Sequence, residues 1–122
     1  QFIESIKPIL LNSKIDLLNI TVRGVAQDTI SFLNYANEDV FGFVFLFNQK
    51  KNEAHEQAMT DLTRKLVDKT ISCEGTFYLP YRLHITKEKM RKCYPQADSF
   101  FILKRKYDST ELFNNKFYQY YK

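Results

Sequence analysis

Glycine and proline are scarce in this sequence, with three residues of each in 122. A loop that cradles a phosphate group needs closely spaced glycines, because several backbone N–H groups must approach the ligand together. The chain has no such run of glycines. The scarcity of both residues also leaves little room for long loops, since they are the strongest turn formers. We therefore expect short connections and no phosphate-binding loop within these residues.

Metal-binding and membrane-spanning patterns are missing as well. The longest apolar run, VFGFVFLF (40–47), has eight residues and is too short to cross a bilayer. His55 and His84 lie far apart, and Cys73 and Cys93 lack the spacing of metal ligands, so we expect no metal site. Neither a signal-peptide pattern nor the surroundings of a catalytic serine or cysteine are present. We expect reduced thiols in a cytoplasmic protein, with a single disulfide as the alternative.

What the sequence does contain is typical of one globular domain. Apolar residues make up 44% of the chain and aromatic residues 16%. The charge is uneven, because residues 82–122 carry ten Lys and Arg against four Asp and Glu, whereas residues 1–81 carry eight against ten. A basic C-terminal third would suit nucleic acid, a phosphate-bearing cofactor or an acidic protein surface. A solvated helix face explains the same charge, and charge alone favours that explanation.

Nucleic-acid binding is the alternative function to consider. Residues 39–46, DVFGFVFL, share Phe41, Gly42, Phe43 and Val44 with the aromatic strand of RNA-recognition motifs. Asp39 stands where that motif has a basic residue, and the expected order of elements is not βαββαβ. A buried row of phenylalanines is the better explanation of this segment.

Hydrophobic periodicity predicts an α+β domain that has an antiparallel sheet, flanking helices and a helical C-terminal tail. The predicted helices are residues 1–11, about 18 residues following an Asn52 cap, residues 87–94, residues 95–107 and a last turn at 110–115 opened by a capping box of Asp108 and Glu111. The predicted strands are residues 17–25, 39–48 and 75–86. Both faces of the 39–48 strand are apolar, so we expect it in mid-sheet and covered on both sides.

The segment GTFYLPYRLHIT (75–86) combines aromatic, basic and imidazole side chains without an acidic residue. Strand alternation would place one apolar set on the core face: Phe77, Leu79, Tyr81, Leu83 and Ile85. The opposite face would then carry Tyr78, Pro80, Arg82 and His84. A phenol, a guanidinium and an imidazole on one face would hold an anionic or hydrogen-bonding ligand, or would simply be exposed to solvent.

Four segments together resemble a known family: NITVRGVAQDT, LNYANEDVFGFVFLFNQ, EGTFYLPYRLHIT and KRKYDSTELFNNKFY. They are similar to the C-terminal part of FAD-dependent oxidoreductases of the vanillyl-alcohol oxidase and p-cresol methylhydroxylase superfamily, which includes cytokinin dehydrogenase and sugar-lactone oxidases. The resemblance spans residues 15–120. Its most specific part, KYDSTELFNN (106–115), is similar to the K-Y-D-P-x-x-L-F-x-N tail of that family, and Ser109 departs from the usual proline.

The resemblance implies that residues 1–122 are a single domain, the C-terminal fragment of a longer flavoenzyme. The fragment would comprise a ferredoxin-like cap region at about 1–95 and a helical tail at about 96–122. The FAD-binding domain would precede it in the same polypeptide and supply the glycines that bind the pyrophosphate. The parent would transfer hydride from a small alcohol, amine or lactol to the flavin. Alone, the chain would be inactive, hold FAD poorly and self-associate through the surface left uncovered.

The resemblance and the alternation together suggest the site residues. Tyr78 and His84 are the catalytic candidates, since either would accept a substrate proton as hydride leaves. Arg82 is the candidate for stabilising charge on the reduced flavin. Asn114 and Asn115 would hydrogen-bond the flavin edge or merely end a helix. Tyr81 and Arg23, with Asn19 beside it in the first strand, are the candidates for substrate binding, although surface exposure is the ordinary explanation for Arg23 and Asn19.

Overall fold

The structure is a computed structural model that describes residues 1–122, and its elements follow the predicted α+β class. The helices are α1 (Phe2–Leu11), α2 (Glu53–Ser72), α3 (Lys87–Cys93), α4 (Ala97–Tyr107) and α5 (Lys116–Tyr121). The strands are β1 (Asp16–Val25) and β2 (Val40–Asn48), which form one antiparallel sheet. None of the helices combines the length and the apolar character needed to cross a bilayer.

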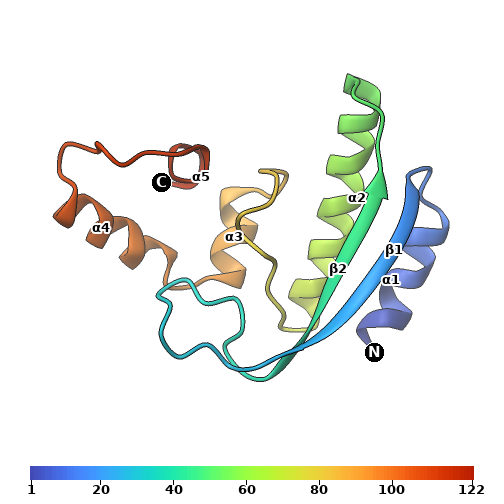
Figure 1. Cartoon of the computed structure of the whole chain (residues 1–122), viewed down its shortest axis with the longest axis horizontal. Coiled ribbons are helices and arrows are strands. Elements are labelled where there is room, and N and C mark those ends of the chain that lie inside the picture. Colours follow the sequence, from blue (N-terminus) through green and yellow to red (C-terminus); the bar gives the residue numbers. More distant parts are fainter.

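The sheet packs on α1 and α2, which lie side by side behind it in Figure 1. Phe45 and Phe47 of β2 contact a buried cluster of Ile6, Leu62 and Leu66 from the two helices. The opposite face of the sheet has no helix over it, as Figure 1 shows. An α-β-β-α order with both helices on one face corresponds to the inner four elements of the ferredoxin-like arrangement.

The prediction that β2 lies in mid-sheet and is covered on both sides is wrong. The sheet has two strands, so β2 is itself an edge strand. Phe41 and Leu46 are exposed, at one end of the strand and on its open face respectively. The error comes from the predicted third strand at 75–86, which the chain does not form.

A second and larger core lies beneath the C-terminal third, where α3, α4 and α5 gather to the left of the sheet in Figure 1. Its buried members come from all three helices and the turn between α3 and α4: Met90, Cys93, Tyr94, Ala97, Phe101, Tyr118 and Tyr121. The hydroxyl group of Tyr121 donates to the carbonyl of Ile85 (3.0 Å), which ties the last helix to the segment before α3. Four of its buried members are aromatic, so this core accounts for part of the aromatic content of the chain.

The predicted capping box at 108–111 does not open a helix. The Asp108 carboxylate accepts the backbone N–H groups of Leu112 (2.9 Å) and Phe113 (3.0 Å), beyond the first turn that it was expected to cap. Glu111 adopts a left-handed φ of 52°, which no α-helix accommodates. The last helix is instead α5, which begins at Lys116, directly after the predicted turn of residues 110–115. The Asn115 side chain caps it by accepting from Tyr118 N (2.8 Å).

The two cysteines are both free thiols, as predicted, but their surroundings differ. Cys73 is exposed, whereas Cys93 is buried in the C-terminal core, where burial raises the pKa of its thiol to about 11. Because the thiolate is the reactive form, we expect one equivalent of a disulfide reagent such as DTNB to react with the native protein. The second equivalent should react only after denaturant is added. Mass spectrometry of the native adduct should find the label on Cys73, and prompt labelling of Cys93 would contradict the packing described here.

Candidate functional site

Residues 75–86 form an irregular segment that contains turns, not a strand. Side chains from elsewhere take its backbone carbonyls: the Tyr94 hydroxyl group donates to Phe77 O, and Arg64 Nε donates to His84 O (2.9 Å). Pro80 offers no N–H to a ladder, which further disfavours a strand. The predicted division into two alternating faces therefore does not apply to this segment.

Arg82 and His84 nevertheless come together, and they meet on Glu56 in the first turn of α2. One carboxylate oxygen, Oε2, lies 2.6 Å from Arg82 Nη1, and the other, Oε1, lies 2.8 Å from His84 Nε2. Gln49, just after β2, donates from Nε2 to Glu56 Oε2 (2.9 Å) and accepts from Arg82 Nη1 (2.7 Å). Three separate segments thus build one polar cluster, which we call the Glu56 cluster: Gln49, Glu56, Arg82 and His84.

Neighbouring side chains stabilise the ionised form of the Glu56 carboxyl group. The hydrogen bond from His84 and then that from Gln49 keep the pKa of the Glu56 carboxyl below its ordinary value, with smaller help from the positive charge of Arg82. A carboxylate stabilised in this way is a weak base, so it suits anchoring cations better than accepting a proton. Arg82 keeps Nε and Nη2 without a partner in the chain, and its side chain is 60% exposed. The free side of the guanidinium group can therefore donate to a ligand.

His84 lies behind this exposed pair and is only 8% exposed. The Thr63 hydroxyl group donates to Met59 O (2.8 Å), so its oxygen is left to accept from His84 Nδ1 (3.3 Å). With Glu56 beside Nε2, both ring nitrogens of His84 have a hydrogen-bond partner in the chain. His84 is thus placed to hold Glu56 in position. The alternation predicted that His84 would lie on the polar face of a strand, whereas its side chain is buried.

Tyr78 and Tyr81, which precede Arg82 in the sequence, contact each other. Strand alternation would have placed these two side chains on opposite faces. Their rings meet edge to face with centroids 5.1 Å apart, and Tyr35 meets Tyr78 in the same way at 5.6 Å. A backbone hydrogen bond from Tyr81 N to Tyr78 O (3.5 Å) marks the turn that brings them together. Both side chains are exposed, and the Tyr78 hydroxyl group has no partner in the chain. They offer aromatic surface and a free hydroxyl group to a ligand.

The other candidate residues lie away from the Glu56 cluster. Asn115 caps α5 through its side-chain oxygen, while Asn114 is exposed and makes no side-chain hydrogen bond. Arg23 lies on the open face of the sheet opposite Gly42, and Asn19 lies on the same face opposite Leu46. None of these four residues contacts Arg82 or His84, so the structure adds no geometric support for a shared site.

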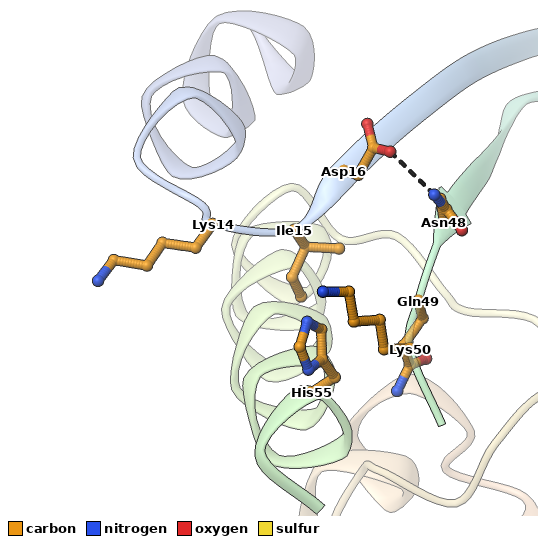
Figure 2. Close-up of a pocket in the computed structure, with 7 residues that line it drawn as sticks. All are labelled: Lys14, Ile15, Asp16, Asn48, Gln49, Lys50 and His55. Carbon is orange, nitrogen blue, oxygen red and sulfur yellow. Dashed lines mark hydrogen bonds between the residues drawn. The ribbon is translucent and has the colours of Figure 1, made fainter. Parts of the chain in front are cut away.

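A small cavity of about 150 Å³ lies next to the cluster and shares Gln49 with it. Figure 2 shows its lining: Lys14, Ile15, Asp16, Asn48, Gln49, Lys50 and His55. Asn48 donates to the Asp16 carboxylate (3.1 Å), and the Lys14 side chain points away from the other six residues. The cavity is smaller than the sites that usually hold drug-sized ligands, at roughly 300–1,000 Å³, and no group of three His, Cys, Asp or Glu residues forms a metal site anywhere in the chain.

The basic residues of the C-terminal third are mostly paired. Besides Arg82, five of them form ion pairs with nearby carboxylates: Lys89 with Asp68, Arg91 with Asp98, Lys92 with Glu88, Lys104 with Asp108 and Lys122 with Glu111. Phe43, one of the aromatic residues considered for base stacking, packs against Phe2 with ring centroids 5.1 Å apart. Both observations weaken the case for a nucleic-acid interface.

Sequence reasoning missed Glu56, Gln49 and Thr63, the residues that organise Arg82 and His84. Glu56 sits in the first turn of a helix, where an acidic residue is ordinary because it complements the helix dipole, so no local signal distinguished it. Its partners lie 26 and 28 residues further along the chain. Comparison of this chain with protein-family models, with curated proteins and with solved structures finds no match.

Proposed function

We propose that this chain is the substrate-side region of an FAD-dependent oxidoreductase, as the sequence resemblance implies. The observation that carries the proposal is Arg82, a guanidinium group fixed on one side by Glu56 and Gln49 and free on the other. An arginine held in this way can bind the carbonyl edge of a flavin ring and stabilise the negative charge of its reduced form. The exposed rings of Tyr78 and Tyr81 border the same segment and provide aromatic surface for a planar ligand or substrate.

The residues suit only the ring end of FAD. None of the three glycines has a positive φ, so the chain offers no glycine-rich nest of successive N–H groups for the pyrophosphate. The free N–H groups of Arg82 and the exposed tyrosine rings suit the flavin ring instead. The proposal therefore assigns the pyrophosphate to a preceding domain of the same polypeptide. When bound, the flavin supplies the hydride acceptor in this chemistry.

The residues of this chain would divide the remaining work. Arg82 binds and orients the ring edge, and Glu56 fixes the position of Arg82 while His84 fixes Glu56. Tyr78 has a free hydroxyl group in an exposed place and is the residue proposed to exchange a proton with the substrate. Tyr81 packs against Tyr78 and holds its ring. The predicted catalytic role of His84 becomes a positioning role in this proposal, because its ring is buried and both of its nitrogens have partners.

The test uses the natural polypeptide that contains this chain. We expect it to purify as a yellow protein that absorbs at about 370 and 450 nm, the usual bands of enzyme-held flavin. Flavin released by denaturation should be identified as FAD by mass spectrometry, or should stay attached to the polypeptide if the link is covalent. A folded, colourless polypeptide that takes up no FAD when it is reconstituted would contradict the proposal.

A further inference from the structure

The outer edge of β1 is open along its whole length. Every backbone hydrogen bond of Asp16–Val25 is made to β2, and no backbone or side-chain group elsewhere in the chain hydrogen-bonds to its other edge. Figure 1 shows β1 at the rim of the sheet, with α1 behind and to the right of it and no further strand beside it. An edge strand of this length presents a row of unpaired N–H and C=O groups, which is a template for another strand.

A bulge gives this edge an unusual charge pattern. Asp16 and Arg23 are an odd number of residues apart, so a regular strand would place them on opposite faces. The irregularity between Leu17 and Asn19 shifts the register by one, and both charges lie on the open face, Asp16 opposite Asn48 and Arg23 opposite Gly42. Neither has an ion-pair partner in the chain, and the Asp16 carboxylate accepts a side-chain hydrogen bond from Asn48 alone.

We propose that β1 pairs antiparallel with β1 of a second copy of this chain, about a two-fold axis at Ile20. In this register the bulged residue Leu18, which has no partner in β2, stays unpaired at the new edge as well. Each side chain then keeps its own face, and residues of matching chemistry pair: Ile20 with its symmetry mate, Thr21 with Asn19, Val22 with Leu17, and Arg23 with Asp16. The last pair occurs twice by symmetry. The result is a four-stranded sheet that carries α1 and α2 of both copies on one face.

The opposite charges at the two ends of β1 indicate that the strand which pairs with this edge belongs to a second copy of the chain. In an antiparallel pair of identical strands the two ends meet each other, so a strand with one negative end and one positive end is complementary to itself. The strand β2 also has an edge, but it carries no charged residue that would set a register. The proposal concerns assembly and stands independently of the proposed flavin chemistry.

Charge exchange at the two ends of β1 tests the pairing. We expect sedimentation equilibrium of the chain, from micromolar to millimolar concentration, to show a monomer–dimer equilibrium. Asp16→Arg would place an arginine opposite Arg23 twice in the dimer, and Arg23→Asp would place an aspartate opposite Asp16 twice. Each single change should raise the dissociation constant of the dimer by about tenfold or more, and the double change D16R/R23D should restore it to within about threefold of the original.

Matched changes elsewhere separate this pairing from a general effect of charge. Asp61→Arg and Lys65→Asp alter the same charges at exposed positions of α2 and should leave the dissociation constant unchanged. Hydrogen exchange of the β1 amides should slow as the dimer forms, and circular dichroism should confirm that each variant is folded. A strict monomer at millimolar concentration, or a double change that fails to restore association, would overturn the proposal. Equal weakening by the α2 variants would overturn it too.

Discussion

Replacing Phe101 with alanine is expected to lower the free energy of unfolding by about 3–5 kcal/mol, the largest stability effect we predict for a single change. The Phe101 side chain is only 2% exposed in the C-terminal core. Its ring contacts those of Phe100, Phe117 and Tyr118, with centroids 5.5, 6.1 and 5.9 Å away, and so joins α4 to α5. Truncation would remove buried apolar area and leave a cavity that neighbouring rings fill only in part. Urea unfolding monitored by circular dichroism measures the change.

Phe113→Ala is the matched control, because it removes the same atoms from a side chain that is 78% exposed. We expect it to change the free energy of unfolding by no more than about 0.5 kcal/mol. Similar losses for the two variants would show that the tail packs differently from the structure described here. A Phe101→Leu variant should fall between the two, since it keeps part of the buried volume.

The second large effect concerns catalysis by the flavoenzyme that we propose. Arg82→Gln in the natural polypeptide is expected to reduce kcat about hundredfold, the usual effect of removing one donor that stabilises developing negative charge. The free Nε and Nη2 groups of Arg82 would no longer meet the ring, while the shorter glutamine keeps a polar side chain at the position. Steady-state turnover and the flavin reduction potential measure the effect, because the reduced flavin anion would lose stabilisation and the potential would fall.

Glu56→Gln tests whether Glu56 acts through Arg82. It removes the charge that fixes the guanidinium group, so we expect a smaller loss in kcat and a shift in the flavin potential in the same direction. The double variant should be no worse than Arg82→Gln alone, because the two residues act as a unit. Arg105→Gln, an exposed arginine without an ion pair, is the control for the loss of a positive charge. Unchanged kcat and potential in Arg82→Gln would remove Arg82 from the proposed site.

Most of the secondary structure follows from local sequence signals. Asn52 caps α2 and Thr86 caps α3 as predicted, each by accepting a backbone N–H three residues ahead. Alternation identified β1, a short apolar run identified β2, and four-residue spacing identified the buried side of α2, including Leu62 and Leu66. These features depend on residues within one or two turns of each other, so the sequence by itself determines them.

The tertiary structure decided the form of residues 75–86 and of residues 108–115. In residues 75–86, the carbonyl of Phe77 accepts from the Tyr94 hydroxyl group, 17 residues away. The carbonyl of His84 accepts from the Arg64 guanidinium group, 20 residues away, so neither carbonyl is left for strand pairing. Glu111 bonds to the hydroxyl group of Tyr118 and to Lys122 (2.9 Å), and these contacts accompany its left-handed backbone. Propensity and periodicity carry no information about such distant partners.

The candidate site shows the same division. Its chemistry was visible in the sequence, because Arg82 and His84 stand two residues apart in a segment without acidic residues. Their partner Glu56 came from the first turn of α2, and the tyrosines that alternation separated were joined by a turn. Residue types and local spacing therefore determined which groups this protein can use. Packing of distant segments alone decided which of them meet, because a hydrogen bond across 26 or 28 residues depends on the whole fold.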